Sequence, residues 1–262
     1  MNNNCPYLEM QCESLHCDCA KYKAYVDAKN DKIVERVLKE NNFDISLTAW
    51  ELLMQMQRSF ASRIRKVDNP TKEEVDKWVD KYLICVEDEI REVREHLVLY
   101  SKNDKNNSID IELKKEVIDI LHFMLDLFIV GGANTHDIQF AYDKKYNVSL
   151  NEKEDLIDVA YNRQKESIDE YLYTKDDINK DITILKASCR LSDACASVRQ
   201  QISWKHWKKP NDFIDFDKLY LAYAEVFHEF INLCILTMNV NEIKDIYIHK
   251  NIENILRQEY GY

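Results

Sequence analysis

The sequence predicts an all-α protein. Only three Gly and three Pro occur in 262 residues, whereas β-rich folds and phosphate-binding loops place Gly at turns. Apolar residues make up 45% of the chain, which is enough for a core at this length. They recur at helical spacings of three and four residues. We therefore expect a multi-helix bundle.

Helical periodicity defines the expected elements in order. Thr48 or Ser46 caps one of the first helices, and Thr71 with Glu74 forms a capping box for the next. Gly131 and Gly132 end a later, strongly apolar helix. The expected helices span 25–40, 48–66, 72–100, 109–130, 135–147, 151–173, 176–202, 215–238 and 240–258.

A weak internal repeat relates the two halves of the chain. It aligns His122 with His228 and Tyr142 with Tyr247. Two copies of a helical unit can close into one bundle around a shared core. The predicted organisation is a Cys-containing N-terminal extension (1–44) and one intertwined helical domain (45–262), with repeat halves at about 45–150 and 151–262.

Charge and cysteine content limit the possible partners and compartment. A formal charge of −11 disfavours nucleic acid and anionic membrane surfaces as partners. No apolar run approaches the ~20 residues of a membrane span, and the first residues lack a secretory signal. The eight Cys are interpreted as reduced thiols of a cytoplasmic protein, with a nuclear location left open. The alternative is a zinc site at the N-terminus, on Cys5, Cys12, His16, Cys17 and Cys19.

Two pairs of acids interrupt apolar helix faces. Glu89 and Glu92 occupy positions on a stripe of helix 72–100 where core residues are expected, and Glu116 and Asp119 do the same in helix 109–130. Unpartnered buried carboxylates are costly, and four converging ones repel each other. Divalent cations relieve this, and Mg²⁺ prefers such oxygen ligands. The first stripe consists of Val75, Trp78, Tyr82, Cys85, Glu89, Glu92, His96 and Leu99.

The last helix carries a candidate phosphate-binding face. Lys250, Asn254 and Arg257 share one side of it, and Lys and Arg are donors for phosphate. A solvated amphipathic helix is the alternative interpretation. His122, near Asp126 on an apolar helix, is interpreted as a structural residue.

Three stretches together resemble the dimeric all-α dUTPases. Glu89-Ile-Arg-Glu92 resembles the first metal motif of that family, and Glu116-Val-Ile-Asp119 followed by His122-Phe123 resembles the second. The C-terminal run of Lys250, Asn251, Asn254, Arg257, Gln258, Gly261 and Tyr262 resembles the family's C-terminal signature. Leu53 and Gln57 are similar to the motif whose Gln reads the base.

The resemblance implies a homodimeric enzyme that hydrolyses dUTP to dUMP and pyrophosphate with Mg²⁺, by attack of water at the α-phosphorus. It implies metal ligation by Glu89, Glu92, Glu116 and Asp119, with Glu92, assisted by Glu89, orienting and deprotonating the water. It also implies substrate contacts from Gln57, Phe123, Lys250, Asn254, Arg257 and Tyr262.

Two departures from the family pattern keep other functions open. Ala61 stands where the family has Asn, so another dNTP, such as dCTP or a modified nucleotide, is an alternative substrate. The family also has a basic-aromatic segment just after its first acidic motif, whereas here the matching segment is 203–209, in the second half. At the repeat offset the second half lacks three of the four acids, which favours a composite site from both halves or across a dimer. A non-catalytic nucleotide-binding or partner-binding protein is the remaining alternative. Secondary candidates are Trp204, Lys205, His206, Trp207, His122 and Asn251.

Overall fold

The computed structural model describes residues 18–65, 71–100, 107–151, 153–172, 177–202 and 214–261. Within these ranges it contains α-helices and no strand, which confirms the predicted all-α class. The helices are α1 (Asp18–Asp27), α2 (Asp31–Glu40), α3 (Ala49–Arg65), α4 (Lys72–Tyr100), α5 (Asn107–Val130), α6 (Thr135–Tyr146), α7 (Leu156–Leu172), α8 (Asp177–Arg199), α9 (Phe216–Thr237) and α10 (Val240–Glu259).

Two expected helices differ most from the observed ones. The range 25–40 contains parts of two helices, because the chain turns after Asp27 and Asn30 caps α2 by accepting from the backbone N–H of Lys32 at 3.1 Å. Helix α7 begins at Leu156 rather than at residue 151. There the Asp155 side chain accepts from the N–H of Ile157 at 2.8 Å, which fixes the start of the helix.

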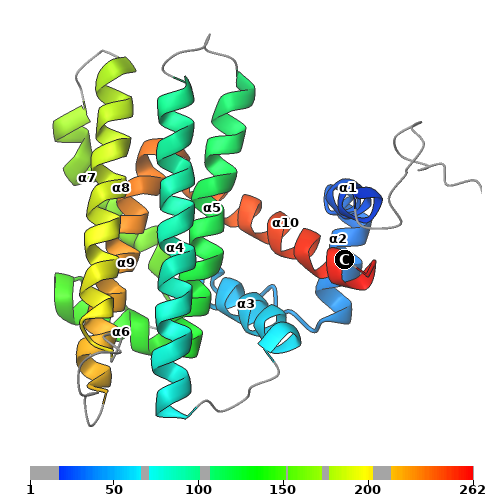
Figure 1. Cartoon of the computed structure of the whole chain (residues 1–262), viewed down its shortest axis with the longest axis horizontal. Helices are drawn as coiled ribbons and strands as arrows, with labels where there is room; N and C mark the ends of the chain where they lie inside the picture. The colour runs from blue at the N-terminus through cyan, green and yellow to red at the C-terminus, as the bar shows by residue number, and fades with distance from the viewer. Residues whose placement is uncertain are drawn as a thin grey trace, which may run out of the picture.

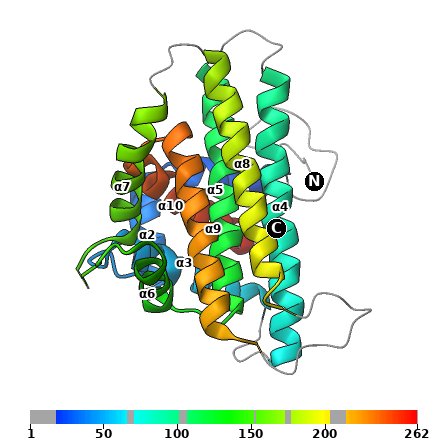
Figure 2. The ribbon, with the colours of Figure 1, turned by 90° about the vertical axis from the view of Figure 1, so that its left-hand side faces the viewer.

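The long helices α4, α5, α8 and α9 lie side by side at the centre of the molecule (Figures 1 and 2). Helix α4 packs on α5 and α8, and α9 packs on the same two neighbours. Helices α3 and α10 pack on α5, whereas α6 and α7 pack on α9. The last helix of each predicted half thus packs on a long helix of the other half.

The burial pattern supports the repeat. In α4 the buried positions include Val79, Leu83, Val86, Ile90, Val93 and Leu97. Exactly 105 residues later, α8 and the turn that follows bury Ile184, Ser188, Leu191, Cys195, Val198 and Ile202. This register places Ala194 and Ser197 at the positions of Glu89 and Glu92. A shift of 106 residues relates α5 to α9 in the same way.

The core stripe of α4 lies beside the predicted one. Trp78, Tyr82, Glu89 and Glu92 are half-buried, whereas the fully buried positions of the helix form the neighbouring row that includes Val79, Leu83 and Ile90. The predicted stripe is therefore the border of the core and not its centre. The acids on it consequently face other side chains while keeping access to water.

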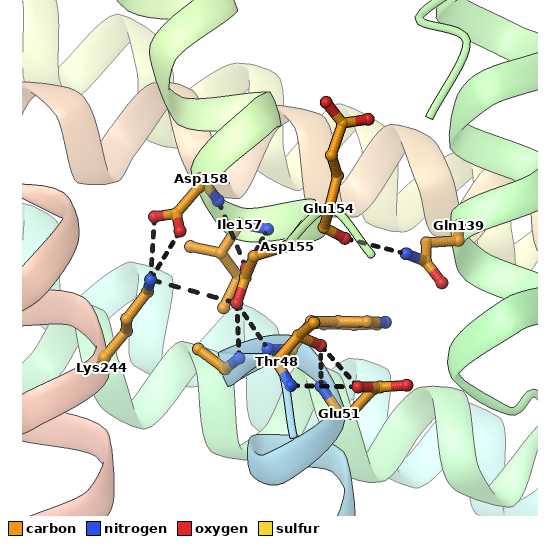
Figure 3. A network of polar contacts seen from close by, with 10 residues as sticks. Thr48, Glu51, Gln139, Glu154, Asp155, Ile157, Asp158 and Lys244 are labelled. Atoms are coloured by element: carbon orange, nitrogen blue, oxygen red, sulfur yellow. Dashed lines mark hydrogen bonds and ion pairs between the residues drawn. The ribbon is translucent and has the colours of Figure 1, made fainter. Parts of the chain in front are cut away.

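One aspartate joins the two halves at the start of α3 and α7. The Asp155 carboxylate accepts from the N–H of Trp50 at 3.3 Å on α3 and also caps its own helix (Figure 3). Lys244 of α10 lies 2.8 Å from Asp158 and 4.0 Å from Asp155. Because anionic groups are favourable at helix N-termini, this network holds α3, α7 and α10 together.

Helix α9 is apolar along most of its length. It is the one described helix long and apolar enough to cross a membrane, which qualifies the expectation that no apolar run reaches this length. In the fold, 67% of its most apolar window is buried against other helices. That environment is typical of a core helix.

Candidate functional site

Three of the four predicted metal ligands converge between α4 and α5. Glu89 and Glu92 of α4 and Glu116 of α5 each offer a carboxylate oxygen, and the three oxygens lie within 4.8 Å of one another. Within the described ranges no other set of three acidic, His or Cys side chains comes this close. The Glu92 side chain is 41% exposed and that of Glu116 is 18% exposed. The cluster is thus partly buried but open to solvent on the Glu92 side.

Burial, followed by the negative charge of neighbouring acids, raises the pKa of Glu89 and of Glu116. Burial raises the pKa of Glu89 to about 7, assisted by the negative charges of Asp119, Glu92 and Glu116. Burial is also the first cause of the raised pKa of Glu116, followed by the charge of Asp119. A divalent cation stabilises the charged form of such carboxylates. Three oxygen donors at this spacing therefore fit a hard cation such as Mg²⁺.

Asp119, the fourth predicted ligand, has a basic partner. Its Oδ2 lies 2.9 Å from Nζ of Lys250, and both side chains are about one-fifth exposed. Glu116 in turn lies 3.4 Å from Nε2 of His96. The structure therefore brings together three of the predicted ligands, and an ion pair links the fourth to the C-terminal helix.

A cavity of about 870 Å³ lies beside this ion pair. Glu116 and Asp119 line it from α5, and Lys250 and Arg257 line it from α10. The two predicted phosphate-binding cations on α10 thus face one cavity whose wall includes two of the acids. Arg257 also forms an ion pair with Glu253 of its own helix. Asn254 is half-buried and does not line the cavity.

Gln57, predicted to read the base, is buried in a polar network with 1% of its surface exposed. Its Nε2 donates to Asp126 at 2.9 Å. Its Oε1 accepts from the Tyr247 hydroxyl at 2.7 Å and from Nδ2 of Asn251 at 3.3 Å. Because both ends of the amide have protein partners, any contact with a base requires an exchange of these hydrogen bonds.

His122 belongs to the same network. Its Nδ1 lies 3.0 Å from Oε1 of Gln57, which can only accept, so Nδ1 carries the proton. The ring stacks on Tyr247 with centroids 4.2 Å apart. Burial, with a smaller effect of the Lys250 charge, lowers the pKa of His122 to about 3. A neutral His fixed in this way joins α5 to α3 and α10.

An aromatic surface lies one to three turns from the acids. Phe123, predicted to lie against the base, is half-buried with its ring centroid 6.5 Å from that of Tyr82. Tyr82 stacks on Trp78 at 6.0 Å. Trp78 and Tyr82 were predicted as core residues. Their position on the same stripe as Glu89 and Glu92 was the signal that they border the site.

Several predicted residues lie outside the described part of the chain. Tyr262 and the basic-aromatic segment with Trp204, Lys205, His206 and Trp207 are among them. So are the side chains of the N-terminal Cys5, Cys12, Cys17 and Cys19, on which a zinc site was considered. The roles expected of these residues stay predictions.

Comparison with known proteins agrees with the motifs. A family model described as dUTPase matches residues 49–262, which is most of the chain. No curated protein and no solved structure matches the chain. The matched region begins at α3 and includes the acids, the cavity-facing side of α10 and the buried Gln57 network. The chain therefore belongs to the dUTPase family and is, by that membership, a dUTP diphosphatase.

Proposed function

We propose that this protein hydrolyses dUTP to dUMP and pyrophosphate with Mg²⁺ at the cluster of Glu89, Glu92 and Glu116. The observation that supports this most strongly is the convergence of three partly buried carboxylate oxygens within 4.8 Å. When bound, divalent cations supply charge neutralisation for the triphosphate and for the charge that develops at the α-phosphate.

The chain's own residues then perform distinct tasks. Glu92, whose side chain is more exposed than that of Glu116, orients a water and accepts its proton. Glu89 lies beside it. The water oxygen bonds to the α-phosphorus, the bond from that phosphorus to the bridging oxygen breaks, and pyrophosphate leaves. Asp119 completes the ligand set when Lys250 exchanges it for a phosphate oxygen, because charge-assisted bonds to phosphate replace the ion pair.

We place the nucleoside on the aromatic surface of Trp78, Tyr82 and Phe123. A uracil ring can pack on the half-buried Phe123, since aromatic faces favour offset stacking with planar rings. Lys250 and Arg257 then face the phosphates from α10, as lining residues of the adjoining cavity. The buried Gln57 side chain holds Tyr247 and Asn251 through hydrogen bonds.

Product analysis tests the proposal directly. Purified protein with Mg²⁺ should convert dUTP to dUMP and pyrophosphate, and chelation should stop the reaction. In ¹⁸O-labelled water the label should enter dUMP, because the water attacks the α-phosphorus. Release of inorganic phosphate with dUDP as product would contradict the proposal.

Base selectivity separates dUTP from the alternative substrates. Ala61 is 4% exposed and lacks the amide that the family pattern places there. A panel of dUTP, dCTP and dTTP under the same conditions should show the highest kcat/KM for dUTP. If dCTP or dTTP is turned over as well as dUTP, the enzyme is a pyrophosphatase for another dNTP. Homodimerisation and a cytoplasmic location stay predictions.

A further inference from the structure

The helix α1 precedes the region that matches the family and yet forms a wall of the cavity beside the acids. Tyr25 of α1 lines the cavity together with Ala28 and Lys29 of the turn that follows, and residues of α5 and α10 line it as well. Ala24 and Ala28 are 0% and 2% exposed, so small side chains four residues apart allow α1 to pack closely against α10. The extension is thereby part of the candidate site's architecture.

Polar contacts fix α1 to the end of α10. The Tyr260 hydroxyl donates to Asp27 at 2.7 Å, and Nζ of Lys23 lies 4.3 Å from the centroid of the Tyr260 ring. Arg36 of α2 lies 3.9 Å from Glu259. These contacts hold the α1 wall against the helix that carries Lys250 and Arg257 (Figure 1).

Two lysines surround Tyr25 at this wall. Nζ of Lys29 lies 3.9 Å from the ring centroid and also donates to the Tyr25 hydroxyl. Nζ of Lys115, from α5, lies 5.6 Å from the same centroid. Because two ammonium groups lie around the Tyr25 ring, this part of the cavity favours an anion over a planar base. The aromatic surface near Phe123, by contrast, has the character of a base site.

The positions along α10 indicate which part of a nucleotide reaches this wall. Lys250, at the acids, and Arg257 are seven residues apart on α10, which corresponds to about 10 Å along the helix axis. Glu253 pairs with Arg257, and its charge also acts on Lys115. The same cavity is lined by the acids Glu116 and Asp119, by Lys250 and Arg257, and by Lys115, Tyr25 and Lys29.

We propose that Lys29 and Lys115, arranged around Tyr25, bind the terminal phosphate of the substrate, so that α1 completes the triphosphate site. The proposal rests on the proposed function, because the acid cluster sets where the α-phosphate lies. Lys115 lies 2.6 Å from Glu112, and both side chains are about one-third or more exposed. A phosphate can replace Glu112 in this pair, since exposed ion pairs contribute little.

The test replaces both lysines with Gln and compares the double variant with Lys32→Gln, an exposed lysine of α2 that does not line the cavity. KM for dUTP with Mg²⁺ should rise roughly tenfold in the double variant, because charge-assisted bonds are lost. The kcat should change less than about twofold, because neither lysine touches the reacting α-phosphorus. Lys32→Gln should leave both constants unchanged.

Binding measurements separate the two proposals. Calorimetric titration with Mg²⁺ and inorganic pyrophosphate, which needs no turnover, should show roughly tenfold weaker binding in the double variant, whereas dUMP binding should be unchanged. Equal pyrophosphate affinity in the wild type and the double variant, or an equal loss of dUMP affinity, overturns the role of the α1 wall. Failure of the wild type to release pyrophosphate from dUTP overturns the proposed function instead.

Tyr260→Phe provides a second, milder variant. It removes the hydroxyl that bonds Asp27 but leaves the ring in place. We expect KM for dUTP to rise severalfold with kcat maintained, and circular dichroism to show an unchanged helical content. An unchanged KM would contradict the assignment of α1 to the triphosphate site.

Discussion

The two halves of the molecule share a framework but not an acid cluster. His122 stacks on Tyr247. Its counterpart His228 lies with its ring centroid 6.1 Å from that of Tyr142, the counterpart of Tyr247, and stacks on Tyr146 with centroids 4.1 Å apart. Gln57 accepts from the Tyr247 hydroxyl, and Gln164 donates to that of Tyr142 at 3.0 Å. Both halves thus join a Gln, a His and a Tyr from three different helices.

The basic partner is also present in both halves. Lys250 pairs with Asp119, and Lys145 pairs with Glu225 at 2.8 Å. The three convergent acids differ, because the second half has Ala194, Ser197 and Ala222 at those positions. Phe123 likewise corresponds to Glu229.

This comparison separates residues that hold the bundle from residues that perform chemistry. The contacts among a Gln, a His and a Tyr occur twice, although only one half has a carboxylate cluster within the described ranges. We therefore attribute these Gln, His and Tyr contacts to the packing of α6 and α10 on the long helices α9 and α5. The acids and Phe123, present once, are attributed to function.

The largest expected effect follows from replacing an acid that the second half lacks. Glu92→Gln should lower kcat for dUTP by roughly 10²–10⁴-fold, as expected for loss of a general base. Ser197→Ala, at the equivalent position in α8, should leave kcat unchanged. Steady-state pyrophosphate release from both variants measures this. A Glu92→Gln enzyme at wild-type rate would refute the assigned role.

The pH dependence of the free energy of unfolding tests whether His122 is buried in its neutral form. Burial lowers the pKa of His122 to about 3, whereas the unfolded chain takes up this proton near pH 6.5. The unfolded state is therefore favoured progressively as the pH falls below 6.5, by roughly 1.4 kcal/mol per pH unit until the folded His also titrates.

Urea unfolding at pH 7, 6 and 5 measures that slope. His122→Gln should have a flatter dependence on pH than the wild type, whereas His136→Gln, at an exposed position, should not differ from it. His228→Gln should flatten the dependence less than His122→Gln, because His228 is only half-buried, although burial lowers its pKa too. Identical slopes for His122→Gln and the wild type would show that His122 is not the group responsible.

The smallest expected effect is the loss of stability when the hydroxyl of Tyr247 or Tyr142 is removed. Tyr247→Phe should destabilise the fold by roughly 1–3 kcal/mol, because the carbonyl of Gln57 loses a buried donor. Tyr142→Phe should cost less, since its neighbour His228 retains the stacking contact with Tyr146. Chemical denaturation of both variants checks this order. A larger loss in Tyr142→Phe would contradict the comparison.

The helices could be predicted from local sequence patterns, whereas the partners of the site's side chains could not. Helix 72–100 was predicted with its observed bounds, because its periodicity and its Thr71–Glu74 capping box are local signals; Thr71 N–H donates to Glu74 at 2.7 Å. The pairing of Asp119 with Lys250 joins residues 131 positions apart. No local pattern specifies such a contact.

The same limit applies to the edges of the site. The acids were found because they interrupt apolar stripes, but the stripe in α4 was placed one row from the true core. Trp78 and Tyr82 were therefore assigned to packing. The role of α1 could not be predicted, since its contacts with α10 depend on tertiary structure rather than on its own periodicity.

Direct measurement of metal binding tests the central claim, that the acids of the first half alone hold the divalent cation. Mn²⁺ binding, followed by electron paramagnetic resonance, should be weakened at least tenfold by Glu116→Gln. Glu225→Gln, an acid of α9 paired with Lys145, should bind Mn²⁺ as the wild type does. Unchanged binding in Glu116→Gln, or an equal loss in both variants, would contradict the account.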